Sequence, residues 1–252
     1  MVPARYASTS FPGKPLAPIR GKGGPKPMIQ RTYEQALLAE TLDLVVVATD
    51  DRRIYDACKA FGAEVVMTGD CPSGTDRCEA AVSQLRRQFD VVVNIQGDEP
   101  LLEPEVIDAV VRALQDSPDA VYSTCVTPMA PEDVPLRQRV KCIVDQLGYA
   151  IYFSRGVLPA NKTGEARPYP APFDRLPYLL HLGLQCYDRG FLAKYAKMPH
   201  TPLQLMEDLE QLKVIENGYK VKVVQVDHAA HGVDLPEDVA SIEAKLLELG
   251  MD

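Results

Sequence analysis

The sequence predicts an α/β fold: a doubly wound, mostly parallel sheet with helices on both faces and a smaller antiparallel extension. Two observations predict it. Over roughly the first 120 residues, short β-branched runs alternate with longer stretches of helical periodicity, the pattern of parallel strands joined by right-handed crossovers. From Ala120 onward the apolar runs follow one another with few helices between them, which favours antiparallel pairing.

Short apolar runs that end in turn residues mark the expected strands. They lie at 44–49, 64–67, 91–96, 120–126, 139–144, 149–153 and 220–226, and a further strand-like run covers 179–187. Helical stretches are expected at 28–39, 51–61, 75–88, 104–115, 203–217 and 236–249. Pro104 and Glu105 are both favourable in the first turn of a helix, and Asn217-Gly218 is typical of a helix end.

The strand that should open such a sheet is almost absent, because only Met1 and Val2 precede Pro3. About three or four buried apolar positions are missing, at about 1.5–3 kcal/mol each, which is comparable to the stability of a whole domain. We therefore expect the sequence to lack residues at its N-terminus.

The composition excludes several classes of protein. The chain has 252 residues, 46% hydrophobic and 25% charged, as in a globular domain. Its formal charge of −8, from 27 Lys+Arg against 35 Asp+Glu, argues against nucleic acid as a partner. No apolar run approaches the roughly 20 residues of a membrane span, and the N-terminus matches neither a signal nor a transit peptide, so we expect a cytoplasmic location. Six scattered cysteines predict reduced thiols rather than disulfides or a zinc site.

Proline clusters mark two ordered loops, with six prolines in 3–27 and five in 159–177. The first loop also carries the cations Arg5, Lys14, Lys22 and Lys26. Backbone N–H groups and lysine charges in a strand-to-helix loop can hold phosphates, although neither a Walker loop nor a G-x-G-x-x-G motif is present. From composition alone, a solvated loop is an equally good interpretation.

Polar residues also follow the strand at 91–96. Asp98 lies at the carboxyl edge of the expected sheet, where open α/β sheets bind ligands. Its carboxylate could hold Mg²⁺ between phosphate oxygens, or it could cap the next helix. Gln96 ends an otherwise apolar strand and needs a partner there.

Motifs spread over essentially the whole chain resemble those of one enzyme family. They are Arg5-Tyr6…Phe11-Pro-Gly-Lys14-Pro-Leu16, Ala48-Thr-Asp50, Ser73-Gly-Thr-Asp-Arg77, Asn94-Ile-Gln-Gly-Asp-Glu-Pro100, Tyr152-Phe-Ser-Arg155, His181-Leu-Gly183, Asp208-Leu-Glu-Gln-Leu212 and His231-Gly-Val-Asp234. Together they are similar to the sugar nucleotidyltransferases, most of all to the 3-deoxy-manno-octulosonate (Kdo) cytidylyltransferase family, the CMP-Kdo synthetases. The sequence around Gln185-Cys-Tyr187 and Glu216-Asn-Gly-Tyr219 is more similar to that of the plant members.

The resemblance implies a Rossmann-like, nucleotide-diphospho-sugar transferase fold in one domain over 1–252. Its nucleotide-binding part would cover about 1–118, and its sugar-binding and dimerisation part about 119–235. The implied reaction transfers CMP from CTP to Kdo and releases pyrophosphate, which activates Kdo for lipopolysaccharide or cell-wall polysaccharide. The implied cofactor is Mg²⁺, and a homodimer is expected.

The same resemblance implies roles for individual residues. The catalytic residues are Asp98, Asp234 and Lys14, and both carboxylates hold the metal. The nucleotide is bound by Arg5, Ser8, Ser10, Lys14, Lys22, Ser73, Thr75, Arg77, Gln96 and Asp98. Kdo is bound by Arg155, His181, Glu210, Gln211 and Tyr187, of which Tyr187 is a weaker candidate, as is Lys141. From the residues alone, Ser73 or Thr75 could simply cap a helix, Asp234 could cap the last one, and a lone histidine such as His181 is more often a core residue.

Two departures from the family pattern bear on activity. Ser10 stands where the family has an arginine expected to meet the triphosphate, which predicts weaker CTP binding because a charge-assisted hydrogen bond is worth roughly 1.5–3 kcal/mol. An insertion in Gly21-Lys-Gly-Gly-Pro-Lys26 leaves open whether Lys22 or Lys26 contacts phosphate. Two alternatives stay open: a sialic acid cytidylyltransferase, and a catalytically impaired nucleotide-binding relative. The loop at 159–177 resembles the family's flap and is expected to order on substrate binding.

Overall fold

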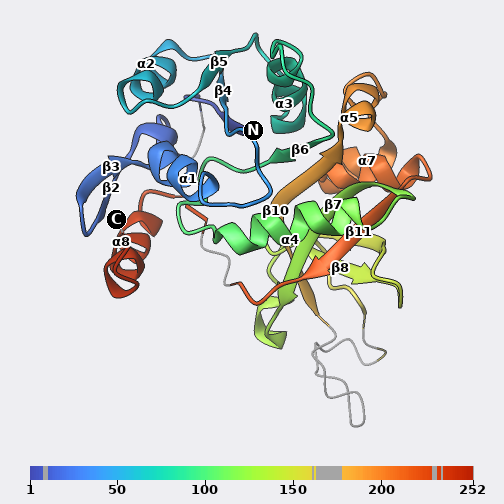
Figure 1. Cartoon of the computed structure of the whole chain (residues 1–252). Helices are drawn as coiled ribbons and strands as arrows, with labels where there is room; N and C mark the ends of the chain where they lie inside the picture. The colour runs from blue at the N-terminus through green and yellow to red at the C-terminus, as the bar shows by residue number, and fades with distance from the viewer. Residues whose placement is uncertain (8–10, 161, 163–177, 229–231, 234, 252) are drawn as a thin grey trace. The chain divides into compact units, whose positions relative to one another are not determined.

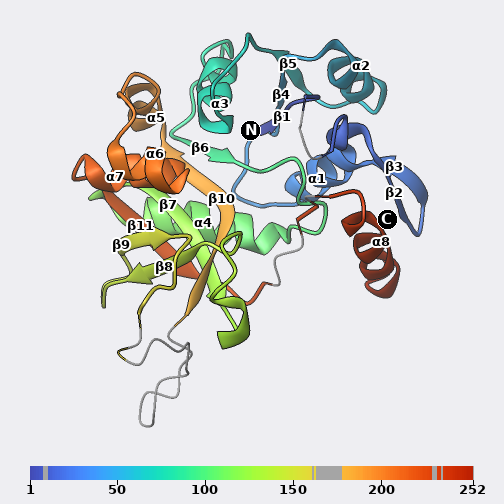
Figure 2. The same ribbon diagram turned by 180° about the vertical axis from the view of Figure 1, so that it is seen from behind.

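The computed structural model describes the chain except for residues 8–10, 161, 163–177, 229–231, 234 and 252. The chain divides into two compact units. The first consists of Met1–Asp108 and Ala230–Asp252, and the second of Ala109–Ala229. The boundary between them falls within helix α4 (Pro104–Gln115), the green helix of Figures 1 and 2, which has its predicted bounds. The predicted loop at 159–177 lies almost entirely outside the described residues.

Parallel strands form the sheet of the first unit, as predicted. β1 (Val2–Ala4), β4 (Val47–Thr49) and β5 (Val65–Met67) pair in the order β1-β4-β5. Met1, directly ahead of β1, bonds to β6 (Val91–Asn94) and to the residue after it. The Met1 ammonium donates to the Val93 carbonyl at 2.7 Å, and the Ile95 N–H donates to the Met1 carbonyl at 2.9 Å.

The first strand therefore exists, and the expectation that it is almost absent is wrong. Val2 is fully buried, and Pro3 and Ala4, which we had assigned to the loop, continue the strand in register with Ala48 and Thr49. Parallel pairing with β4 places this strand inside the unit, where Val2 and Ala4 are both buried.

Helices α1 (Met28–Ala36), α2 (Arg52–Ala60), α3 (Gly74–Val82) and α8 (Asp238–Glu248) lie close to their predicted positions. Asp51 caps α2 by accepting from the Arg53 N–H, and Ser73 caps α3 by accepting from the Asp76 N–H. One core cluster of this unit consists of Ile19, Met28, Leu101, Val233, Ile242 and Leu246.

The first proline-rich loop contains structure that the sequence did not predict. A turn of 3-10 helix at η1 (Lys14–Leu16) is followed by a hairpin of β2 (Pro18–Gly21) and β3 (Gly24–Pro27). Arg31 of α1 is buried and donates to the carbonyls of Ile19 and Gly24 at 2.8–2.9 Å. The inserted Gly-Lys-Gly-Gly segment is therefore the tip of a hairpin anchored by a buried guanidinium.

The second unit has the predicted antiparallel extension. Its strands are β7 (Ala120–Pro128), β8 (Lys141–Val144), β9 (Ala150–Ser154), β10 (Leu179–Asp188) and β11 (Lys220–Gln225), in the order β11-β7-β10-β8-β9. Only the pairing of β11 with β7 is parallel among these neighbours. The register of β10 against β7 shifts between His181 and Gln185. A short 3-10 turn, η2 (Pro131–Asp133), follows β7.

The helix predicted at 203–217 is wrong as a single element. It divides into α6 (Pro202–Glu207) and α7 (Glu210–Glu216), because Asp208 adopts a left-handed conformation with φ of 52°. Aspartate tolerates that region better than most residues. A further helix, α5 (Arg189–Tyr195), was not predicted; Asp188 caps it by accepting from the Phe191 N–H at 2.7 Å.

All six cysteines are buried free thiols, as the prediction of reduced thiols expected. Burial raises the pKa of Cys58 to about 12, so this thiol stays protonated at neutral pH. Within the described part of the chain, no helix is both long and apolar enough to span a membrane.

Candidate active site

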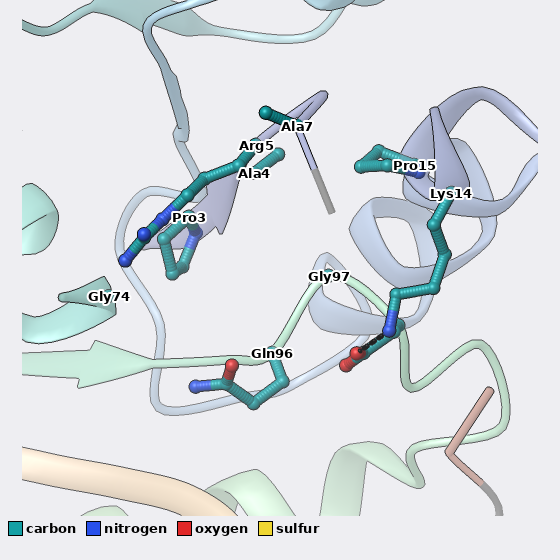
Figure 3. Close-up of a pocket in the computed structure, with 10 residues that line it drawn as sticks. Pro3, Ala4, Arg5, Ala7, Lys14, Pro15, Gly74, Gln96 and Gly97 are labelled. Carbon is teal, nitrogen blue, oxygen red and sulfur yellow. Dashed lines mark hydrogen bonds and ion pairs between the residues drawn. The ribbon is translucent and has the colours of Figure 1, made fainter. Parts of the chain in front are cut away.

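A cavity of about 410 Å³ lies in the first unit, beyond the carboxyl ends of β1 and β6 (Figure 3). Open α/β sheets bind ligands at this edge. Four residues predicted to bind the nucleotide line it: Arg5, Lys14, Gln96 and Asp98. The rest of the lining is Pro3, Ala4, Ala7, Pro15, Gly74 and Gly97.

Lys14 and Asp98 form an ion pair in this cavity. The Lys14 Nζ donates to Asp98 Oδ2 at 2.5 Å and to the Val233 carbonyl at 2.8 Å. Lys14 begins η1 directly after Gly13, whose φ of 74° suits glycine and turns the chain there. The side chain of Lys14 is 16% exposed and that of Asp98 is 29% exposed, so both charges are partly shielded from water but accessible from the cavity.

The remaining polar side chains of the cavity make longer hydrogen bonds to the protein than Lys14 does. Arg5 is exposed and donates to the Pro72 carbonyl at 3.2 Å. Gln96 donates from Nε2 to Asn94 Oδ1 at 3.3 Å. Figure 3 shows the Arg5 and Gln96 side chains on one side of the cavity and Lys14 on the other. Guanidinium, amide and ammonium donors around one space suit an anionic ligand with polar edges.

Gly97 has a steric reason to be glycine. A Cβ atom there would lie 3.0 Å from Ile29 Cδ1 and 3.3 Å from the Pro3 carbonyl oxygen. Sequence reasoning missed Gly97 and the other backbone and proline contributors to the wall, because their place in the site depends on close backbone approach rather than on side-chain chemistry.

Three predicted nucleotide-binding residues do not line the cavity and have structural partners. Ser73 caps α3 and donates to Asp76 Oδ2 at 2.8 Å. Thr75 is fully buried. Arg77, also fully buried, donates to Thr68 Oγ1 and to Asp50 Oδ2, each at 2.6 Å. The Arg77 guanidinium therefore ties α3 to the ends of β4 and β5.

The two lysines left open by the insertion lie on the β2–β3 hairpin. Lys22 is exposed at the hairpin turn, and Lys26 pairs with Glu34 Oε2 at 2.9 Å. Neither lines the cavity, whose lysine is Lys14. Ser8, Ser10 and Asp234 lie outside the described residues.

A magnesium ion would find one described carboxylate in this cavity, that of Asp98. Mg²⁺ prefers oxygen ligands and usually takes one or two protein carboxylates together with phosphate oxygens and water, so the donor suits the ion. No group of three acidic, histidine or cysteine side chains that could hold a metal occurs among the residues that the structure describes.

In the second unit, His181 and Gln211 are brought together. His181 Nε2 lies 2.9 Å from Thr124 Oγ1, and its Nδ1 lies 3.4 Å from Gln211 Nε2. Phe153 packs edge-on against the imidazole, with ring centroids 4.9 Å apart. Burial lowers the pKa of His181 to about 4, so the ring is neutral at pH 7.

Tyr187 and Glu210, also predicted to bind Kdo, lie in the same unit. Tyr187 is fully buried, packs edge-on against Tyr122 at 4.7 Å and donates to Gln185 Oε1 at 3.2 Å. Glu210 begins α7, and its carbonyl accepts from the Tyr195 hydroxyl at 3.0 Å.

Arg155 and Lys141 have main-chain partners. The Arg155 guanidinium donates to the carbonyls of Glu207 at 2.7 Å, Asp208 at 3.2 Å and Arg137 at 3.5 Å. Lys141, fully buried, donates to three carbonyls, including that of Arg155 at 2.8 Å. Burial lowers the pKa of the Lys141 ammonium. Arg155 thus holds the backbone at the α6–α7 junction. Lys141 holds the backbone of Leu136, Arg139 and Arg155 itself.

The family model described as "Cytidylyltransferase" matches residues 1–223 of the chain. The chain belongs to the cytidylyltransferase family. Two similar plant proteins within this family carry a more specific name. The 3-deoxy-manno-octulosonate cytidylyltransferase of Zea mays is 60% identical over 245 residues, covering 97% of this chain and 79% of that protein. The mitochondrial 3-deoxy-manno-octulosonate cytidylyltransferase of Arabidopsis thaliana is 58% identical over 252 residues, covering 100% and 83%.

A solved structure agrees with both relatives. CMP:2-keto-3-deoxy-manno-octonic acid synthetase complexed with CTP superposes on this cytidylyltransferase with a TM-score of 0.86 and 34% identity, over 97% of this chain and 96% of that one. The predicted fold class and the predicted resemblance to the Kdo cytidylyltransferase family are therefore confirmed.

Proposed function

We propose that this cytidylyltransferase transfers CMP from CTP to Kdo, giving CMP-Kdo and pyrophosphate. The observation that carries the proposal is the Lys14–Asp98 pair, which places a cation and a carboxylate in one cavity at the ligand-binding edge of the sheet. The high identity to proteins named 3-deoxy-manno-octulosonate cytidylyltransferase supports Kdo as the sugar. The similarity to a synthetase complexed with CTP supports CTP as the nucleotide.

In this reaction the anomeric hydroxyl oxygen of Kdo attacks the α-phosphorus of CTP in line, and the bond to the leaving pyrophosphate breaks. Lys14 would exchange Asp98 for phosphate oxygens and stabilise the charge that develops on pyrophosphate. Arg5 and Gln96 would position the nucleotide in the cavity. Magnesium, held by Asp98 and by Asp234, would supply Lewis-acid stabilisation of charge on the phosphates and the attacking oxygen.

The second unit would recognise the sugar through His181, Gln211, Glu210 and Tyr187. Because Arg155 donates to the carbonyls of Glu207 and Asp208, we assign it the task of holding the α6–α7 junction from which Glu210 and Gln211 project. We further propose a cytoplasmic homodimer whose product serves lipopolysaccharide or cell-wall polysaccharide synthesis.

Pyrophosphate release tests the function. The protein is incubated with CTP and Mg²⁺, with Kdo, with sialic acid, or with neither. We expect release with Kdo alone among these. Release with sialic acid but not Kdo would identify the other cytidylyltransferase, and no release with either sugar from folded protein would leave a nucleotide-binding relative. A Ser10→Arg variant is expected to lower the KM for CTP by about tenfold or more, because it restores a charge-assisted hydrogen bond.

A further inference from the structure

Four groups of the second unit form a continuous hydrogen-bonded chain. Thr124 Oγ1 lies 2.6 Å from the Leu184 carbonyl oxygen and 2.9 Å from His181 Nε2. The other ring nitrogen of His181, Nδ1, lies 3.4 Å from Gln211 Nε2. Thr124 is fully buried on β7 and bridges the register shift in β10 between His181 and Gln185. The chain thus runs from a main-chain carbonyl to the side chain of Gln211.

The direction of each hydrogen bond follows from proton counting. A carbonyl only accepts, so the single hydroxyl proton of Thr124 is donated to Leu184. The Thr124 oxygen must then accept from His181, which places the imidazole proton on Nε2. A neutral imidazole carries one such proton, so Nδ1 is an acceptor. The amide of Gln211 therefore meets His181 with its NH₂ group, and its oxygen Oε1 is directed elsewhere.

We propose that Thr124 is a positioning residue for sugar recognition: it fixes the tautomer of His181 and, through the imidazole, the orientation of the Gln211 amide. This inference rests on the proposed function for the identity of the sugar. It assigns to Gln211 an amide oxygen turned away from the ring, the group that accepts a hydrogen bond from a hydroxyl of a polyhydroxylated acid.

Removal of the Thr124 hydroxyl would permit a second arrangement of the hydrogen bond between His181 and Gln211. With no acceptor at Nε2, the imidazole proton can move to Nδ1, and the Gln211 amide can turn so that Oε1 accepts from Nδ1–H. The NH₂ group would then face away from the ring. Every hydrogen bond that Gln211 makes to a sugar hydroxyl would then have the reversed direction. A sugar that binds with the Gln211 oxygen facing it would therefore bind more weakly when the NH₂ group faces it.

The test compares Thr124→Val, which keeps the side-chain shape and removes the hydroxyl, with Thr124→Ser, which keeps the hydroxyl. Ser123→Ala is the matched control, because Ser123 is a fully buried neighbour on β7 whose hydroxyl donates to the Val110 carbonyl at 2.7 Å. The tautomer of His181 is read from ¹⁵N NMR of histidine-labelled protein, and KM values are measured separately for Kdo and CTP.

We expect the Nε2–H tautomer in the wild type, in Thr124→Ser and in Ser123→Ala. In Thr124→Val we expect a mixed or Nδ1–H tautomer, a KM for Kdo raised by roughly tenfold and an unchanged KM for CTP. An Nδ1–H tautomer in the wild type would overturn the proposal even if Thr124→Val does not fold. So would an unchanged tautomer and KM for Kdo in Thr124→Val. Absence of pyrophosphate release by the wild type would instead overturn the proposed function. The tautomer measurement would still test whether Thr124 fixes the proton of His181, because it does not depend on activity.

Discussion

Lys14 and Asp98 form a direct ion pair in the cavity of the first unit, with Nζ 2.5 Å from Oδ2. The two residues lie 84 positions apart in the sequence, on the first loop and after β6. Under the proposed function, Lys14 would bind the nucleotide and Asp98 the metal, and these ligands would replace the ion pair when they bind. Activity and stability should therefore depend on Asp98 very differently.

Asp98→Asn is expected to lower kcat by about 10²-fold or more, because under the proposed function the variant removes the carboxylate that would hold the metal beside the reacting phosphates. The free energy of unfolding should fall by only about 1 kcal/mol or less, since both side chains are partly exposed. Kinetics with CTP and Kdo and urea unfolding check the two effects. Glu99→Gln, at the neighbouring position, is the control for loss of an acidic group. A large loss of stability with unchanged kcat would contradict the assignment.

The three lysines of the first loop are expected to differ in their contribution to kcat/KM for CTP. Lys14→Met keeps the aliphatic stem but removes the charge from the cavity, and should lower kcat/KM for CTP by about 10²-fold. Lys22→Met and Lys26→Met should change it by less than about threefold, because Lys22 is exposed at a hairpin turn and Lys26 pairs with Glu34. Steady-state kinetics of the three variants decide the matter. A loss in either hairpin variant as large as that in Lys14→Met would show that the hairpin reaches the nucleotide.

Sequence periodicity predicted most strands and helices because each buries an apolar face of its own. It failed where long-range contacts decide. The helix predicted at 203–217 breaks at Asp208. The Arg155 guanidinium, from beyond the end of β9, donates to the carbonyls of Glu207 and Asp208 at that break. No local pattern in 203–217 reports a partner some 50 residues away. The hairpin of β2 and β3 was missed for a similar reason, since buried Arg31 satisfies its carbonyls.

The candidate site was predictable in its chemistry and less so in its geometry. Lys14, Gln96 and Asp98 follow strand ends or a loop that the sequence identifies, and they line the cavity. Arg77 carries an equally suggestive charge, yet it is fully buried against Asp50. A charged side chain near a strand end does not reveal whether it faces a ligand or the protein, because that depends on partners brought together by folding.

Arg155→Met distinguishes support of the α6–α7 junction from direct contact with the sugar carboxylate. If the guanidinium holds the junction, the variant should lose about 1.5–3 kcal/mol of unfolding free energy, the usual contribution of hydrogen bonds from a charged group. The KM for Kdo should rise with it, whereas the KM for CTP should not. Urea unfolding and kinetics are the measurements, with exposed Arg137→Met as the control. A raised KM for Kdo at unchanged stability would indicate that Arg155 binds the substrate itself.

His181 should make stability depend on pH. Burial lowers its pKa from 6.5 to about 4 in the folded protein, so between these values the unfolded state binds the proton and the folded state does not. The free energy of unfolding therefore falls as pH decreases through this window, by up to about 3 kcal/mol. Above pH 7 both states are neutral and the contribution is constant.

His181→Gln removes this titration. The difference in unfolding free energy between wild type and variant, measured by urea unfolding, should shrink or reverse between pH 7.5 and 4, because only the wild type loses the contribution. Other titrating groups are common to both proteins and cancel in the difference. His200→Gln, at an exposed position, should parallel the wild type throughout. A wild-type-to-variant difference that stays constant over this range would mean that the His181 ring accepts its proton as readily in the folded protein as in the unfolded chain.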